Sequence, residues 1–517
     1  MKSPWLWRAA ALLFVASMVL VGLGDPLLLQ TDEGFAANRA MSLYMYDSAL
    51  VTYDDPFIPQ FNKPPLFYWL VAIFYRAIGF NTWAVRLPTA LFSIGVCALL
   101  YLINRRYFSE RIALLSAVLV CTIPFCLFHA RTAMLEMPLI FFILLTIYLL
   151  AYARPATWAA ALAGVACAAA FMIKGAAALI ALPAALIVSL IRRRFTLKTW
   201  WHLPIFFIAG LAPMLAYYLA LPREYADLFF DSLFHNEDSG NLSAITLDGR
   251  WPSLYLPLIK YLRWHIPAAV AGFILILAGL RKNPRIMEWL ILALLLCAPT
   301  AVVGLKMVNP FTRYFLIMYP FILTLSAFFA LETTRSPRTA WLLLPFALAC
   351  PFVEQSGWAW IPAGTAVLVL ALAQILRFTG WSLSPLVMQS ALIMAIAVPS
   401  SFSGAAREVW NLPPRLQAEP IAIRFAEKAR GLLAEHDVLV FGGSGYKKHD
   451  IFFYSRRPCI GIDVWLREYF KPGVETVGIF YKADMTGIPG IRASVLAQEG
   501  PWKLLKIPAS NAVAATH

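Results

Sequence analysis

The chain has 517 residues, of which 61% are hydrophobic and 14% are charged, and this balance excludes an ordinary soluble globular protein. The net charge is +15, but the basic residues lie in short clusters between apolar runs of membrane-spanning length, which argues against nucleic acid as a partner. Six of the seven cysteines lie in or beside apolar segments, so no disulfide framework or metal–thiolate site is indicated. We therefore expect an α-helical polytopic membrane protein that contacts membrane lipids.

The first apolar run extends from Ala9 to Gly24 and follows Lys2 and Arg8. A signal peptide is the alternative, but no A-x-A-like cleavage site follows and many further apolar segments do. The run is predicted to be the first transmembrane helix, with its N-terminus in the cytoplasm.

Basic clusters mark cytoplasmic loops, so consecutive clusters should be separated by an even number of spans. The later apolar segments lie near residues 83–103, 112–128, 138–153, 157–173, 176–191, 201–220, 266–280, 286–304, 314–331, 340–353, 358–376 and 383–400. Together with the first helix they predict about thirteen spans.

The apolar stretch from Pro64 to Phe80 is predicted to be an interfacial helix, because counting it as a span would invert every later loop. The acidic or long loops, 25–63, 129–137 and 221–265, then face outward, together with a short turn at 174–175. We expect the chemistry on that side of the membrane.

From about residue 402 the composition becomes that of a soluble domain. A helix over 419–436 and strands over 437–441, 459–464 and 476–481 predict a small α/β domain. We expect residues 1–401 to form the transmembrane catalytic domain and residues 402–517 a periplasmic α/β domain, in a multi-pass inner-membrane protein.

Ionisable residues near the membrane are candidates for function. Asp32 and Glu33 follow the first helix, and a carboxylate there could act as a general base on an incoming hydroxyl. The alternative is a helix start in which Asp32 caps and Glu33 favours the dipole. Lys63, before Pro64 and Pro65, would lie at the height of a lipid phosphate, or would simply extend to the interface.

Later segments add further candidates. Glu136 opens an apolar helix, a costly place for a carboxylate unless it pairs with a cation such as Arg131 or binds a divalent metal ion. Lys174, at a turn with almost no loop, suits a phosphate monoester that gains charge as it leaves. His235 is either a metal or substrate ligand or a surface histidine.

Arg313 and Tyr314, near the start of a late span, are similar candidates for binding the phosphate, with interfacial anchoring as the alternative. Arg131 is a further candidate for stabilising the departing phosphate. A transporter or flippase of a lipid-linked substrate would also suit many spans, although no clear internal repeat is present. A non-catalytic envelope assembly factor is a third reading.

These pieces, in this order, resemble the GT-C glycosyltransferases of the lipid A aminoarabinose transferase and protein mannosyltransferase-like group. The resemblance covers roughly residues 25–320 and is carried by an acidic pair, Lys-Pro-Pro-Leu-Phe-Tyr-Trp, Ala-Arg-Thr-x-Met-Leu-acid-x-Pro, Lys-Gly and Arg-Tyr. The Lys-Pro-Pro segment and its distance from Asp32 are the most specific parts.

The resemblance implies an inverting hexosyl or pentosyl transfer from a polyprenyl-phosphate sugar to a lipid or glycan acceptor, such as lipid A or lipopolysaccharide. We expect the enzyme to be a monomer. It implies that Asp32 is the essential carboxylate and that Lys63 and Lys174 bind the carrier phosphate. The chain departs from the family pattern at three places: Asn62 and Glu136 replace a glutamate and an aspartate, and Gly34-Phe35 replaces Arg-Tyr. These departures leave the metal and the sugar open.

Overall fold

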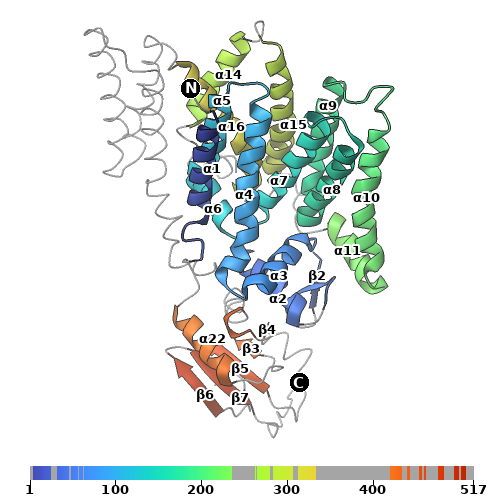
Figure 1. The fold of residues 1–517 in the computed structure, drawn as a ribbon. Coiled ribbons are helices and arrows are strands. Elements are labelled where there is room, and N and C mark those ends of the chain that lie inside the picture. The colour runs from blue at the N-terminus through green and yellow to red at the C-terminus, as the bar shows by residue number, and fades with distance from the viewer. Residues whose placement is uncertain are drawn as a thin grey trace, which may run out of the picture. The chain divides into compact units, whose positions relative to one another are not determined.

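The structure is a computed structural model (Figure 1), and it divides into two compact units that are described separately. The first unit contains residues 1–21, 89–219 and 229–411, and the second contains residues 22–88, 220–228 and 412–517. The described residues are 4–24, 32–45, 48–55, 58–61, 63–235, 262, 265–279, 283–306, 312–333, 420–432, 439–442, 453–456, 459–461, 476–481, 494–499 and 502–507. The last three predicted spans and the predicted domain boundary near residue 401 lie outside them.

Helices occupy every predicted apolar segment of the first unit that falls within the described residues. They are α1 (Pro4–Leu20), α4 (Thr82–Asn104, from Thr89 onward), α5 (Glu110–Thr122), α6 (Pro124–Arg131), α7 (Glu136–Ile147), η1 (Tyr148–Tyr152), α8 (Thr157–Lys174), η2 (Gly175–Ile180), α9 (Ala181–Ile191), α10 (His202–Ala220), α14 (His265–Gly279), α15 (Arg285–Lys306), η3 (Thr312–Met318) and α16 (Tyr319–Thr333).

Four helices in the described part of the chain are long and apolar enough to cross a membrane. The number rises to five when α5 and α6 are counted as one span. These two helices are bent by 71° where Pro124 starts α6, because proline lacks the N–H that would continue the helical ladder. A helical membrane protein is thus confirmed, whereas the count of thirteen spans stays a prediction.

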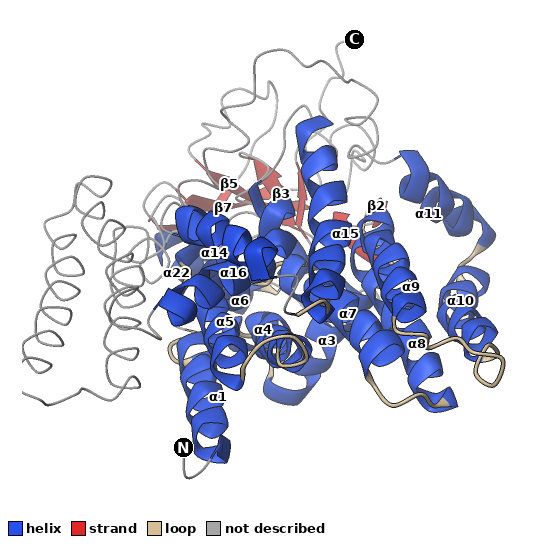
Figure 2. Cartoon of the chain, turned by 90° about the horizontal axis from the view of Figure 1, so that it is seen from above, coloured by secondary structure: helices blue, strands red, loops and turns tan. Residues whose placement is uncertain are grey.

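Helix α7 packs against both α8 and α9 (Figure 2). We refer to α7, η1 and α8 as the hairpin. Helix α8 ends at Lys174 because Gly175 adopts φ +57°, a conformation that other residues rarely reach. The chain then returns through η2 and α9, and Arg192 after α9 donates to the Ala151 carbonyl at 3.0 Å. The end of α9 therefore lies at the same end of the hairpin as η1, and the predicted reversal at 174–175 is confirmed.

A buried asparagine joins four helices of the first unit. The Asn104 amide donates to the Ser116 and Thr324 hydroxyls, each at 2.8 Å, and its carbonyl accepts from the Trp289 indole at 2.9 Å. Asn104 and Trp289 are fully buried. A buried polar group with satisfied partners fixes how helices pair, because any other arrangement leaves those partners unbonded.

In the second unit, α2 (Asp32–Met45) packs on α3 (Leu66–Ile78), beside the hairpin of β1 (Thr52–Asp55) and β2 (Ile58–Gln60). The Tyr44 hydroxyl donates to the Ala72 carbonyl at 2.5 Å, and the Tyr75 hydroxyl donates to the Ala37 carbonyl at 3.1 Å. Helix α3 has 13 residues, a length of about 20 Å that is too short to cross a hydrocarbon core of about 30 Å. This agrees with an interfacial helix.

The C-terminal part of the second unit contains α22 (Pro420–Leu432) and a five-stranded sheet in the order β4-β3-β5-β7-β6. The predicted strands appear as β3 (Leu439–Gly442), β4 (Cys459–Gly461) and β5 (Thr476–Tyr481), with β3 parallel to both neighbours.

Sequence analysis missed the antiparallel pair β6 (Ser494–Glu499) and β7 (Trp502–Ile507). Gly500-Pro501 between them was the turn signal that could have revealed the hairpin.

Close packing of α8 on α10 depends on Gly164. A Cβ atom at this position would overlap the Phe206 carbonyl oxygen and would lie 2.9 Å from the Gly210 nitrogen. We expect Gly164→Ala to destabilise the protein by about 1–3 kcal/mol, because backbone atoms on both helices would have to separate. Thermal unfolding in detergent measures this loss.

The matched control is Gly279→Ala, because a Cβ atom at Gly279 meets no other atom within 4 Å. Equal melting temperatures for the two variants would contradict the close-packing argument.

Candidate active site

The acidic pair of the second unit forms the first turn of α2, and its two members have different surroundings. The Asp32 side chain is exposed, whereas Glu33 is fully buried. Only Asp32 is therefore accessible to a solvent-borne or membrane-borne acceptor.

Glu33 is held by a buried arginine from the start of α4. The Arg86 guanidinium donates to both Glu33 carboxylate oxygens, at 2.7 and 2.8 Å, and to the Leu23 carbonyl at 2.9 Å. Side-chain exposure is 1% for Arg86 and 0% for Glu33. Removing one partner of such a pair costs about 3–5 kcal/mol, because the other charge stays buried without compensation.

This pair fixes the start of α2, where Asp32 lies. Sequence analysis missed Arg86, although a single arginine inside the apolar segment 83–103 was a signal that could have revealed it.

Lys63 precedes the buried Pro64 and Pro65 at the entry to α3 and is itself half-buried. Helices α3 and α2 are joined nearby, where the Arg39 guanidinium donates to the Tyr68 hydroxyl at 2.8 Å. Lys63 is thus held on the rigid α2–α3 pair. Asn62, the residue at which the chain departs from the family pattern, lies outside the described residues.

A second cluster, in the first unit, surrounds Glu136 at the start of α7. The Lys174 ammonium donates to Glu136 Oε1 at 2.7 Å, and Arg313 Nε lies 3.3 Å from the same oxygen. Glu136 and Lys174 side chains are 6% and 8% exposed, and Arg313 is 20% exposed. The ion-pair alternative for Glu136 therefore holds, with Lys174 and Arg313 as its cations.

Aromatic side chains border this cluster. The Lys174 ammonium lies 4.6 Å from the centroid of the Tyr314 ring, a distance at which a cation is attracted by the ring face. His129 is buried on α6, with Nδ1 2.9 Å from the Phe125 carbonyl oxygen, and it interacts electrostatically with Glu136, Lys174 and Arg313. Sequence analysis did not single out His129.

Two cations share one carboxylate in this cluster, since Lys174 and Arg313 both contact Glu136 Oε1. Phosphate oxygens are strong acceptors for lysine and arginine, so the cluster suits an anionic ligand.

A metal ion suits these residues less well. No group of three His, Cys, Asp or Glu residues within the described ranges is arranged to hold one. Glu136 also faces two cations, whose charges would repel a divalent ion. The described residues around Glu136 therefore do not fit the metal site that the sequence allowed.

The sequence offered Arg131 as the cation that pairs with Glu136, whereas the structure places its guanidinium at the end of α1. Its Nη1 donates to the carbonyls of Met18, Val19 and Val21, at 3.1, 3.1 and 2.7 Å. A cation that bonds the last carbonyls of a helix satisfies groups that have no partner within the helix. Arg131 thus holds the end of α1.

The structure brings together Glu136, Lys174, Arg313 and Tyr314 in the first unit, whereas Asp32, Glu33 and Lys63 belong to the second unit. His235 is the last residue of α11 (Arg223–His235), and its side chain lies outside the described residues.

The fold matches that of a protein of known structure over nearly the whole chain. The structure of ArnT from Cupriavidus metallidurans bound to undecaprenyl phosphate superposes with a TM-score of 0.71 at 18% sequence identity. The match covers 99% of this chain and 98% of ArnT.

Sequence comparison gives shorter matches. A protein of Aquifex aeolicus is 32% identical over 119 residues, which are 23% of this chain and 24% of that protein. The protein named "Putative mannosyltransferase YycA" from Bacillus subtilis is 28% identical over 110 residues, 21% of this chain and 16% of its own length. The matched regions thus span a quarter or less of these curated relatives.

A family model described as dolichyl-phosphate-mannose-protein mannosyltransferase matches residues 62–217. This stretch includes Lys63, Glu136 and Lys174. These matches agree with the resemblance predicted from the sequence: the chain has the fold of ArnT, and residues 62–217 match the mannosyltransferase family model.

Proposed function

We propose that this protein transfers a sugar from a polyprenyl-phosphate carrier to an envelope acceptor, such as lipid A or lipopolysaccharide, with inversion at the anomeric carbon. The observation that carries the proposal is the cluster in which Lys174 and Arg313 share the single carboxylate of Glu136. Its two neighbouring cations suit a lipid phosphate, whose oxygens are strong acceptors for lysine and arginine. The likeness to ArnT with bound undecaprenyl phosphate and to the mannosyltransferase family supports the same class of donor.

The leaving group sets the main electrostatic demand. The bond between the anomeric carbon and the phosphate oxygen breaks, and the departing phosphate monoester takes the bonding electrons and gains negative charge. Lys174 and Arg313 stabilise that charge more in the transition state than in the ground state, which is the condition for catalysis. Glu136 holds the two cations next to each other before the donor binds, because its negative charge offsets their mutual repulsion.

The nucleophile requires a base. Asp32 accepts the proton of the acceptor hydroxyl as its oxygen forms the new bond to the anomeric carbon, so the proton moves to the carboxylate. Glu33, held by Arg86, positions the turn that carries Asp32. Lys63 binds the carrier phosphate, as the family resemblance implies.

The same proposal places the protein in the inner membrane as a monomer with many spans and a periplasmic C-terminal domain. A flippase for a lipid-linked substrate is the rival. The two are separated by incubating purified protein with radiolabelled polyprenyl-phosphate sugar, because only a transferase releases free polyprenyl phosphate and glycosylates an acceptor.

Replacing the proposed base tests the mechanism directly. We expect Asp32→Asn to lower turnover by about 10²–10⁴-fold, because an amide cannot accept the proton. The measurement is the rate of release of polyprenyl phosphate, with the melting temperature as a check on folding. Asp227→Asn is the control, since Asp227 is another exposed carboxylate.

Near-normal turnover by the Asp32→Asn variant would remove Asp32 from the mechanism. Membrane-impermeant labelling of cysteines placed at residues 32 and 174 gives a second check. Reaction of the two positions from opposite membrane faces would refute a common role.

The cationic cluster is tested through Lys174. We expect Lys174→Gln to lower turnover by about 10²–10³-fold, because the variant loses one charge that stabilises the leaving phosphate. Lys198→Gln, at an exposed position beyond α9, is the control that removes the same charge elsewhere. Equal rates for the two variants would contradict the role of Lys174.

Metal dependence follows from the same cluster. Because Lys174 and Arg313 supply positive charge at Glu136, we expect transfer to continue in excess EDTA. Loss of activity in EDTA that is restored by Mg²⁺ or Mn²⁺ would show that a divalent ion is required instead.

A further inference from the structure

At the end of α7 and α8 remote from Glu136 and Lys174, the protein surface has a small, shallow pocket that is open to the outside. Its walls are apolar side chains of η1, α8 and the loops at this end, and its polar lining is basic. The side chains that matter here are Leu149, Leu150, Phe195, Arg154, Arg194 and His202.

The pocket and the proposed active-site cluster lie at opposite ends of one helical hairpin. Helix α8 has 18 residues between Thr157 and Lys174, a length of about 27 Å that is close to the thickness of a bilayer core. One end of the hairpin therefore reaches one membrane surface, and the pocket opens at the other.

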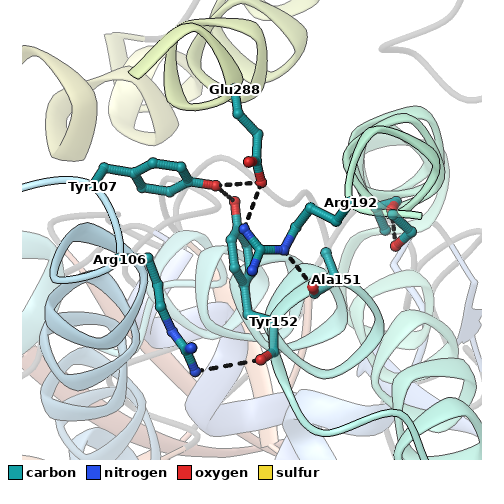
Figure 3. A network of polar contacts seen from close by, with 8 residues as sticks. Arg106, Tyr107, Ala151, Tyr152, Arg192 and Glu288 are labelled. Carbon is teal, nitrogen blue, oxygen red and sulfur yellow. Dashed lines mark hydrogen bonds and ion pairs between the residues drawn. The ribbon is translucent and has the colours of Figure 1, made fainter. Parts of the chain in front are cut away.

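The positive charges at the pocket are not neutralised within the described residues. The one carboxylate in the neighbouring network, Glu288, accepts from Arg192 at 2.8 Å and from the Tyr107 hydroxyl at 2.6 Å (Figure 3). Arg194 donates instead to the uncharged Ala153 carbonyl, and Arg154 is exposed.

The potential at the pocket favours an anion. Burial, together with the positive charges of the neighbouring Arg192 and Arg106, lowers the pKa of Arg194. A bound anion would relieve this repulsion between cations.

The surroundings of the pocket are those of a membrane interface. Trp158 and Trp200 are 58% and 62% exposed, and tryptophan is enriched where hydrocarbon meets headgroups. Helix α10 begins at His202 in the pocket wall, and only 11% of its apolar window is buried by protein. An acyl chain could therefore lie along α10 from the pocket outward.

We propose that this pocket binds one anionic glycerophospholipid, with the headgroup phosphate between Arg154 and Arg194 and an acyl chain on the exposed face of α10. The apolar wall and the neighbouring lipid-facing helix favour a membrane lipid over a soluble anion. The site is separate from the proposed active site and binds a different lipid.

The test uses the purified full-length protein in mixed micelles and counts bound lipid by native mass spectrometry. The probes are palmitoyl-oleoyl phosphatidylglycerol, the matching zwitterionic phosphatidylcholine, and sn-glycerol 3-phosphate as a soluble anion. We expect one phosphatidylglycerol per protein, bound at least about fivefold more tightly than phosphatidylcholine.

Two variants locate the lipid. Arg154→Ala removes an exposed charge and should weaken phosphatidylglycerol binding by about fivefold, while Lys198→Ala, an exposed position that does not line the pocket, should leave it unchanged. Ala156→Phe should also weaken binding, because it fills the pocket without changing charge.

Several results would overturn the proposal. Equal retention of the two lipids would indicate only non-specific lipid contact, and displacement of the lipid by equimolar glycerol phosphate would indicate a soluble anion. Unchanged binding by Arg154→Ala, or by a folded Ala156→Phe variant, would mean that the pocket is not the binding site.

Discussion

The structure depends on one constraint, the free-energy cost of placing charged side chains in an apolar bundle. Two buried carboxylates, Glu33 and Glu136, are compensated by cations in different ways. Arg86 and Glu33 are both buried, their charges cancel, and the remaining guanidinium nitrogen is bonded to a backbone carbonyl. That pair is complete and needs no ligand. Around Glu136 a second cation, Arg313, shares the carboxylate with Lys174 and is partly exposed. The first pair therefore stabilises the fold, whereas the second cluster is the one that we propose binds an anion.

Helix length decides where the charged side chains can lie. Residues at the two ends of α8 are held about 27 Å apart, so Lys174 and the arginines after α9 lie at opposite ends of the hairpin, a separation close to the thickness of a bilayer core. Gly175 makes this possible, because its positive φ ends α8 directly after Lys174 and returns the chain without a polar loop. The lysine is thereby fixed at the helix end beside Glu136.

Hydrophobic periodicity predicted the elements well, but not their partners. The segment 157–173 became Thr157–Lys174, and the strand 476–481 was found with the same bounds. The ion-pair partners of the buried carboxylates were harder to predict, because the partner of Glu33 is 53 residues away in the sequence and that of Glu136 is 38 residues away. Closeness in sequence favoured Arg131 as the cation for Glu136, since it lies only five positions earlier. Its Nη1 instead donates to the Val21 carbonyl at the end of α1. Only the tertiary structure distinguishes these alternatives.

The interior of the hairpin also bears on the choice between transfer and transport. The buried face of α7 between Glu136 and η1 consists of apolar side chains, with Thr146 as the polar exception. The Thr146 hydroxyl donates to the Phe142 carbonyl at 2.8 Å, so its hydrogen atom is already bonded within the helix. A phosphate headgroup moving along this face would lose its hydration without gaining partners. The proposed transfer demands less of this hairpin, because it keeps the charged group at the end where Lys174 and Arg313 lie.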